Sequence, residues 1–101
     1  MSTTYQLTLY TKEASCLLTF YYNGKARVMI IDNVEVNEKF RGKGYGTELI
    51  KEAIETAKDE NVDSVELQVN SDNEVAKRLY QKSGFEKTNK EYYRLILNHF
   101  K

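Results

Sequence analysis

Hydrophobic and polar residues alternate along the first third of the chain with a period of two. This is the period of a strand that buries one face and exposes the other. The pair Asn23-Gly24 follows the second such segment and is typical of a hairpin turn, because both residues tolerate a positive φ. Asp32-Asn33 interrupts the third segment and indicates either a bulge or a local polar contact. The predicted strands are residues 5–10, 16–22 and 26–36.

From residue 44 the pattern changes to the period of a helix, and a strand is then predicted over residues 65–69. Ser71 with Glu74 three positions later is typical of a capping box at the start of a second helix. Gly84 is suited to end that helix in a left-handed conformation. The apolar stripe of the first helix, over residues 44–60, consists of Leu49, Ile50, Ala53, Ile54 and Ala57. The second helix is expected to bury Val75, Ala76, Leu79 and Tyr80.

Two more short strands are predicted at the end of the chain, one directly after Phe85 and one over residues 92–98. The complete order is βββ-α-β-α-ββ, an antiparallel meander followed by two crossover helices. The 101 residues include no linker rich in Pro, Gly or Ser. We therefore expect one mixed α/β domain over residues 1–101.

Composition and charge narrow the classes of function. Fifteen basic and fifteen acidic residues cancel, which argues against a general nucleic-acid-binding protein. The single cysteine, Cys16, permits no intramolecular disulfide and favours a cytoplasmic protein in which it is a small buried hydrophobe. No apolar run approaches the roughly 20 residues of a membrane span, and the polar N-terminus is no signal peptide. With one cysteine and one histidine (His99), no metal site is expected.

The segment Arg41-Gly42-Lys43-Gly44-Tyr45-Gly46, called the glycine loop below, lies between the third strand and the first helix. Its three glycines are not explained by helix propensity, since each costs about 1 kcal/mol relative to alanine. Glycine lets successive backbone N–H groups converge on an anion at a helix N-terminus, where the helix dipole favours negative charge. The loop therefore predicts a phosphate-binding site to which Arg41 and Lys43 add positive charge. The alternative is a glycine-rich turn with incidental basic residues.

Two motifs in this order resemble those of the GCN5-related N-acetyltransferase (GNAT) superfamily. The first, Arg/Gln-x-x-Gly-x-Gly/Ala, is present as Arg41, Gly44 and Gly46. The second, Asn-x-x-Ala-x-x-Leu-Tyr-x-x-x-Gly-Phe, is present as Asn73, Ala76, Leu79, Tyr80, Gly84 and Phe85. The resemblance spans roughly residues 28–97. It implies the GNAT fold, a mostly antiparallel sheet that splays open between its third and fourth strands.

The resemblance also implies an enzyme that moves an acetyl group from acetyl-CoA to a primary amine by direct attack in a ternary complex. The strand backbone at Val34 and Val36 would pair with the pantetheine arm, Asn73 would hydrogen-bond to it, and an N–H near Val36 would polarise the thioester carbonyl. Tyr80 would be the general acid that protonates the departing thiolate, or else only a core aromatic. The pyrophosphate would be held by Gly42, Lys43, Gly44, Tyr45, Gly46 and Thr47.

The chain departs from the family pattern at both usual positions of the general base. These are Gln68, five residues before the motif asparagine, and Ile30 on the preceding strand; neither side chain takes a proton. Asp32, Glu35 and Glu66 remain as candidates, but a solvated strand residue is the better explanation of each, and no general base is assigned. The departure keeps open an alternative function, a GNAT-fold protein that binds CoA or a protein partner without catalysis.

A second departure is the absence of the helix pair that the family usually inserts between its first two strands. Residues 11–14 are too few to contain it. The acceptor side of the site is therefore expected to be open. Two interpretations follow: the acceptor is a bulky or protein-borne amine, or the second subunit of a homodimer completes the pocket.

Overall fold

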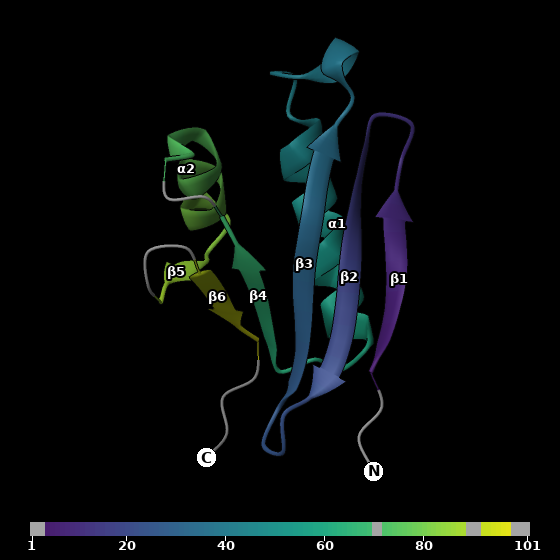
Figure 1. Cartoon of the computed structure of the whole chain (residues 1–101), viewed down its shortest axis with the longest axis vertical. Coiled ribbons are helices and arrows are strands. Elements are labelled where there is room, and N and C mark those ends of the chain that lie inside the picture. Colours follow the sequence, from purple (N-terminus) through teal and green to yellow (C-terminus); the bar gives the residue numbers. More distant parts are fainter. Residues whose placement is uncertain (1–3, 70–71, 89–91, 98–101) are drawn as a thin grey trace.

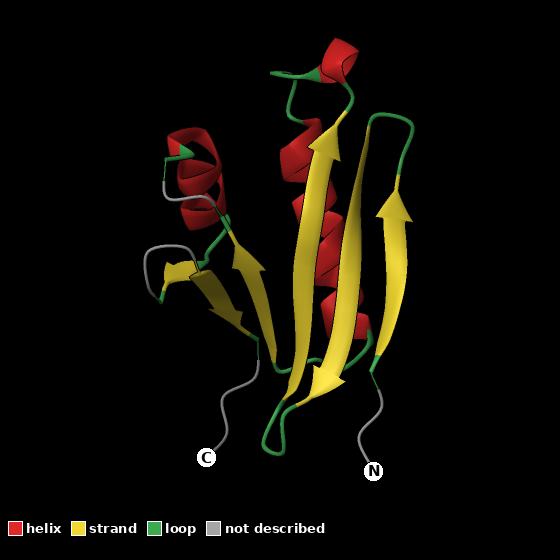
Figure 2. Cartoon of the chain, viewed as in Figure 1, coloured by secondary structure: helices red, strands yellow, loops and turns green. Residues whose placement is uncertain are grey.

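The computed structural model describes residues 4–69, 72–88 and 92–97, and their secondary structure follows the predicted order βββ-α-β-α-ββ (Figure 2). In chain order the elements are β1 (Tyr5–Tyr10), β2 (Ala14–Tyr22), β3 (Arg27–Val36), the short 3-10 helix η1 (Glu38–Phe40), α1 (Tyr45–Asp59), β4 (Ser64–Gln68), α2 (Glu74–Lys82), β5 (Glu86–Lys87) and β6 (Tyr92–Ile96). Asn98, the predicted end of the last strand, and His99 lie outside the described residues.

The strands form one sheet in the order β1-β2-β3-β4-β6-β5 (Figure 1). Neighbouring strands are antiparallel except β3 and β4, which run parallel and are joined through α1. The last β3–β4 pair joins Ile31 to Leu67, after which the two strands diverge. The mostly antiparallel sheet, splayed between its third and fourth strands, is therefore confirmed.

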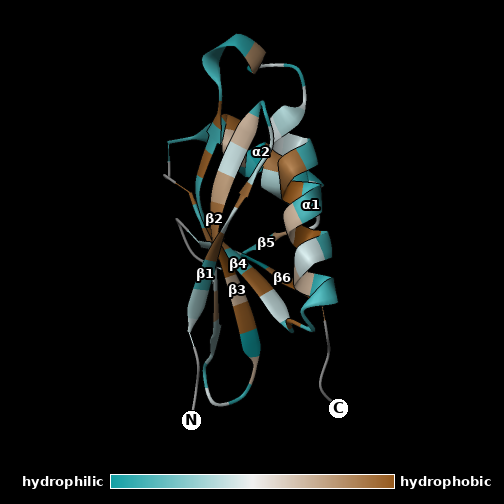
Figure 3. Ribbon diagram, turned by 90° about the vertical axis from the view of Figure 1, so that its right-hand side faces the viewer, coloured by the Kyte–Doolittle hydropathy of each residue, from teal (hydrophilic) through white to brown (hydrophobic). Residues whose placement is uncertain are grey.

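Both helices pack on the same face of the sheet. α1 lies along it with its apolar stripe toward the strands (Figure 3), and Leu49, Ile50, Ala53 and Ala57 are buried as predicted. The end of α2 lies on that face too, since a Cβ at Gly84 would be 3.5 Å from Leu95 Cδ1. Neither helix has the length and hydropathy needed to cross a membrane. In the described part of the chain, the opposite face of the sheet carries no helix.

Local turn chemistry shapes β3 at both ends. Before the strand, Gly24 adopts a φ of 94°, while Asn23 Oδ1 accepts the N–H groups of Lys25 and Ala26. Near its end, the β2–β3 register shifts by one residue, and Asn33 has a φ of 51°. The polar interruption in the sequence is therefore a β-bulge, which bends the strand where it leaves β4.

Two expectations for the second helix are wrong. Its N-cap is Asn73 rather than Ser71, which lies outside the described residues. Asn73 Oδ1 accepts the N–H of Ala76 at 3.1 Å, so the asparagine satisfies the helix start two residues later. Val75 is 72% exposed instead of buried, because the first turn of α2 faces a cavity and not the sheet.

Candidate functional site

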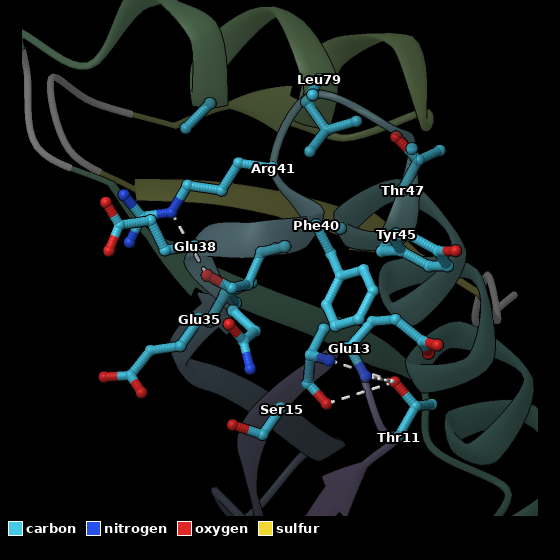
Figure 4. Close-up of a pocket in the computed structure, with 18 of the residues that line it drawn as sticks. Thr11, Glu13, Ser15, Glu35, Glu38, Phe40, Arg41, Tyr45, Thr47 and Leu79 are labelled. Atoms are coloured by element: carbon cyan, nitrogen blue, oxygen red, sulfur yellow. Dashed lines mark hydrogen bonds between the residues drawn. The ribbon is translucent and has the colours of Figure 1, made fainter.

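A cavity of about 1060 Å³ opens at the end of β3 where the sheet splays; we call it the large cavity (Figure 4). Four segments line it: the β1–β2 connection, the end of β3, the glycine loop with the start of α1, and the first turns of α2. A volume of this size suits a large organic ligand. Among the predicted site residues, those that line it are Val34, Val36, Arg41, Gly42, Gly44, Tyr45, Gly46, Thr47, Asn73 and Tyr80. Lys43 does not.

The glycine loop ends in a helix N-terminus that has no side-chain cap. Gly42 and Gly44 adopt left-handed φ values of 78° and 89°, and Gly44 is the N-cap of α1. The first helical hydrogen bond runs from Glu48 N–H to the Gly44 carbonyl. In the described structure the three preceding N–H groups, at residues 45–47, donate to no protein acceptor. Uncapped N–H groups at the positive end of a helix dipole are suited to an anion, so the predicted role of the loop remains a prediction that this geometry permits.

Arg41 fastens the loop to the end of β3. Its Nε donates to the Val36 carbonyl at 3.2 Å, as the dashed line in Figure 4 shows, while the rest of the guanidinium has no ion pair in the described part of the chain. Phe40 packs edge-on against Tyr45, with ring centroids 5.5 Å apart. These contacts hold the cationic loop against the strand whose open edge lines the same cavity.

That open edge of β3 is the second component of the site. Beyond Ile31 the strand still pairs with β2, but no described strand lies on its other side. α1 begins beside this edge, where a Cβ at Gly46 would make an ordinary contact of 3.5 Å with Val36 Cγ2. The backbone groups around Val34 and Val36 are therefore available to an extended ligand, in the same way that an exposed edge strand can pair with an added strand.

α2 positions the third component, Tyr80, through capping at both ends. Asn73 starts the helix, and a Schellman motif ends it: Phe85 N–H donates to the Tyr80 carbonyl at 3.0 Å, and Gly84 N–H to that of Gln81 at 3.1 Å. Gly84 provides the left-handed residue, with a φ of 99°. The ring of Phe85 then packs against that of Tyr80, with centroids 6.1 Å apart. The Gly-Phe end of the motif thus fixes the tyrosine.

The hydroxyl of Tyr80 reaches the cavity although the residue is only 6% exposed. It has no hydrogen bond in the described part of the chain, where no buried polar side-chain atom is left without a partner. The hydroxyl must therefore be accessible from the cavity. Burial, and to a lesser degree the neighbouring Cys16, raises the pKa of Tyr80 above its usual value, so the phenol remains a proton donor.

Cys16 is a buried free thiol, 2% exposed, as the sequence predicts. Burial raises its pKa to about 11. A thiol that remains protonated at neutral pH is a poor nucleophile, so an acyl-cysteine role has no support.

A smaller cavity of about 340 Å³, called the inner cavity below, lies beyond Tyr80 at the point of divergence of β3 and β4. It shares Val34, Asn73, Ala76 and Tyr80 with the large cavity. Its other lining residues come from the two diverging strands and are Ile31, Asp32, Asn33, Leu67, Gln68 and Val69. The two cavities therefore meet around Tyr80.

The three candidate bases occupy different environments. Glu66 is paired with Arg94, its Oε2 accepting from Nε and Nη2 at 3.1 Å each. Glu35 is exposed and lies at the wall of the large cavity (Figure 4). Asp32 is half-buried and lines the inner cavity together with Gln68.

A third depression, the interhelical groove, runs between α1 and α2 and measures about 870 Å³. Thr47 and Leu79 belong both to it and to the large cavity. Its cations, Lys51, Arg78 and Lys82, are all exposed. This groove is not predictable from the sequence, because the two helices that contribute the charges are far apart along the chain.

Comparisons with known proteins cover most of the chain. The family model described as the acetyltransferase (GNAT) family matches residues 11–85. YobR of Bacillus subtilis, named as an uncharacterized N-acetyltransferase, is 38% identical over 64% of this chain and 26% of its own length. MJ1207 of Methanocaldococcus jannaschii, with the same designation, is 44% identical over 61% of this chain and 27% of its own.

The structure points to the same group. A Bacillus subtilis acetyltransferase solved in complex with CoA aligns with a TM-score of 0.74 and 22% identity, over 92% of this chain and 76% of that one. At this identity the likeness shows the fold. With the family match, it establishes that the chain belongs to the acetyltransferase (GNAT) family, as the two motifs predict. The chain spans about a quarter of the length of the curated relatives it matches.

Proposed function

We propose that the chain binds acetyl-CoA in the large cavity and transfers its acetyl group to a primary amine. The observation that carries this proposal is the convergence on one cavity of the glycine loop, the open edge of β3 and the hydroxyl of Tyr80. An anion site, a site for an extended chain and a proton donor match the pyrophosphate, the pantetheine arm and the thioester. Acetyl-CoA would supply the activated acyl group.

The N-terminal side of α1 would hold the pyrophosphate. The free N–H groups of residues 45–47 need an acceptor, and a diphosphate provides several oxygens to them. Arg41 keeps its terminal nitrogens for the same anion, because only Nε is used on Val36. Lys43 lies outside the cavity wall and would contribute through its longer-range charge.

The pantetheine arm would lie along β3 and α2. Val34 and Val36 offer backbone groups on the unpaired edge, and Val75 offers an exposed apolar surface in the same cavity. Asn73 uses its Oδ1 on the helix cap, which leaves its Nδ2 group to donate to an amide oxygen of the arm. Capping the helix and binding the ligand are therefore compatible roles for this residue.

Tyr80 would then act as the general acid. Its hydroxyl opens into the cavity and its raised pKa keeps the proton in place at neutral pH. A phenol that still holds its proton can donate it to the departing thiolate, because the ordinary pKa values of a tyrosine, about 10, and a thiol, about 8.5, lie close together. The backbone near Val36 would place an N–H beside the thioester carbonyl, a role for which strand N–H groups are suited.

The alternative function is a protein that binds CoA but does not catalyse transfer. It is favoured by Gln68 and Ile30, which occupy the two positions where the family places its general base. Gln68 lines the inner cavity and Ile30 precedes the lining residue Ile31, but neither side chain is titratable. The open phenol of Tyr80 favours the enzyme, because binding alone has no need of a proton donor there.

The deciding experiment is a calorimetric titration of the chain with acetyl-CoA, followed by mass spectrometry of amines incubated with both. We expect saturable micromolar binding of one acetyl-CoA per chain, and a mass increase of one acetyl group on a primary amine. Absence of binding at high micromolar acetyl-CoA would overturn the proposal. Binding without transfer to any amine would favour the alternative function.

Arg78→Glu tests whether the anionic nucleotide end of acetyl-CoA extends into the interhelical groove. Reversing this charge beside Lys51 and Lys82 is expected to weaken acetyl-CoA binding about fivefold at low salt, and less at high salt because exposed charges are screened. Lys58→Glu, at the far end of α1, is the matched control and should leave the affinity unchanged. Equal affinities for the two variants would place the nucleotide elsewhere.

A further inference from the structure

We propose that Asp32 is the residue that selects the acceptor: its carboxylate binds the acceptor amine in the inner cavity as a primary alkylammonium ion. This inference rests on the proposed function, since it places the acceptor beside the acyl group of a bound acetyl-CoA. It deepens that function by assigning the residue that binds the acceptor.

Asp32 lies next to the point where β3 and β4 diverge. Asp32 immediately follows Ile31, the last β3 residue paired with β4, and it precedes the bulge at Asn33. It therefore lies where the sheet opens. The inner cavity that it lines also contains Tyr80, which would act on the thiolate at the other side of the same reacting group. A ligand in the large cavity whose thioester reaches Tyr80 would present its acyl carbon to the inner cavity. The bound ammonium ion would first lose one proton to solvent, and the neutral amine would then attack this carbon. As the carbon–sulfur bond breaks, Tyr80 would protonate the thiolate, and the extra proton on the new amide nitrogen would leave to solvent, from which Tyr80 is reprotonated.

The lining of the inner cavity carries negative charge. The residues that line the inner cavity include one acid, Asp32, and no lysine, arginine or histidine within the described part of the chain. The glycine loop at the opposite end of the site is cationic. The combined site is thus polarised, with positive charge where a diphosphate would bind and negative charge where the acceptor would enter.

The carboxylate of Asp32 has no partner in the described structure, where it takes part in no side-chain hydrogen bond or ion pair. Glu66 is close along the same side of the sheet, because its register partner Ile30 is two residues before Asp32. Yet Glu66 forms an ion pair with Arg94, so the guanidinium of Arg94 pairs with Glu66 and not with Asp32. A half-buried carboxylate without a counter-ion favours a cation that brings its own N–H donors.

The inner cavity also limits the shape of the acceptor. A volume of about 340 Å³ accommodates an alkyl chain and one ammonium group. Polar neighbours Asn33 and Gln68 supply further acceptors for the N–H groups. The class is therefore a primary alkylammonium, whether a lysine side chain, a chain N-terminus or a free small amine.

Two thioether analogues test the assignment without knowledge of the acceptor. S-ethyl-CoA carries an uncharged ethyl group in place of the acetyl group. S-(2-aminoethyl)-CoA carries an ammonium group on the second carbon from the sulfur, close to where the attacking amine would lie. We expect the chain to bind the amino analogue about five- to tenfold more tightly than the ethyl analogue. Asp32→Asn should remove this preference and leave the affinity for S-ethyl-CoA unchanged. Glu52→Gln, on α1 and outside both cavities, is the control and should keep the preference.

Each other outcome is decisive. If the unaltered chain shows no preference, or if Asp32→Asn retains it, the assignment of Asp32 is wrong while acetyl-CoA binding stands. If Asp32→Asn loses both analogues together, Asp32 is a structural residue and the assignment also fails. If the unaltered chain binds neither analogue, the proposed function itself fails and takes this inference with it.

Two acceptor probes then distinguish the sources of the ammonium group. One is n-butylamine, and the other is a short peptide with blocked ends and a single lysine. Faster acetylation of the peptide would identify a protein-borne acceptor, and faster acetylation of butylamine a free amine. For the preferred probe, Asp32→Asn should raise KM more than it lowers kcat, because the carboxylate acts in binding.

Discussion

Replacing Tyr80 with phenylalanine is expected to lower the rate of acetyl transfer about 100-fold while acetyl-CoA affinity changes less than about twofold. The substitution removes one hydroxyl, which opens into the cavity and has no protein partner in the described part of the chain. The ring, its packing on Phe85 and the capped helix all remain. Steady-state kinetics with acetyl-CoA and a primary amine, beside calorimetry of acetyl-CoA, measures the two quantities separately.

Tyr93→Phe is the control for this experiment. Tyr93 is as deeply buried as Tyr80, but it lies on β6 and lines neither the large nor the inner cavity. Its substitution should leave the rate unchanged. If Tyr80→Phe and Tyr93→Phe retain equal activity, Tyr80 is a core aromatic and another group protonates the thiolate.

The pH dependence of the reaction follows from the direction of the Tyr80 pKa shift. Burial disfavours the phenolate, so the pKa is raised and the proton donor is present throughout the neutral range. Loss of activity through ionisation of Tyr80 belongs above pH 10. Any rise in rate between pH 7 and 9 must then come from deprotonation of the acceptor amine, whose pKa is about 10.4 for a lysine-like group.

Much of the fold was predictable because it depends on local signals. The period-two segments became β2 and β3, the helical stripe became the buried side of α1, and Gly84 ended α2 as expected. Each of these outcomes is decided by residues within a few positions of one another. The contact of Phe85 with Tyr80 is equally local, and it explains why the tyrosine and the Gly-Phe pair occur at a fixed spacing.

The errors in α2 arise where two local solutions compete or where tertiary packing decides. Ser71 and Asn73 are both good N-cap residues, and nothing in the sequence ranks them. Val75 continues the apolar stripe of its helix, yet it faces the large cavity and has no side chains to pack against there. An apolar residue exposed inside a cavity is therefore a feature of the site that periodicity alone assigns to the core.

The distinction among the three candidate bases was beyond the sequence for a different reason. Glu66 is occupied only because β6 pairs with β4 in a register that brings Arg94 opposite it. Asp32 lies one residue beyond the end of the β3–β4 ladder, where the strands diverge, and has no ion pair in the described part of the chain. Both facts depend on pairing between distant segments, which a single sequence does not specify.

Substituting alanine for Gly44 is expected to reduce acetyl-CoA affinity about tenfold and to destabilise the fold by about 1–2 kcal/mol. Gly44 is the N-cap of α1 with a φ of 89°, a conformation that an L-residue adopts at that cost. The altered loop relieves the strain by relaxing, and the N–H groups of residues 45–47 then turn from the anion. Binding must restore the strained form, so the affinity falls by the corresponding factor.

Substitutions at two other glycines separate the effect of backbone strain on stability from the effect on acetyl-CoA binding. Gly24, in the β2–β3 turn, has a φ of 94° and open space around it, as Gly44 has, but it lies far from the cavity lining. Gly24→Ala should therefore cost similar stability without any loss of affinity. Gly46 has no left-handed φ, and an added Cβ would make an ordinary 3.5 Å contact with Val36. Gly46→Ala should keep the affinity and stabilise α1 by up to about 1 kcal/mol.

Thermal unfolding and calorimetry of the three variants give the stabilities and affinities. The family pattern requires glycine at the position of Gly44 and permits alanine at the position of Gly46. The backbone explains this difference. Gly44 must adopt a left-handed conformation to expose the N–H groups, whereas Gly46 already belongs to the helix. If Gly44→Ala binds acetyl-CoA as tightly as Gly24→Ala does, the loop is a turn with incidental basic residues. The anion site must then be sought in the interhelical groove.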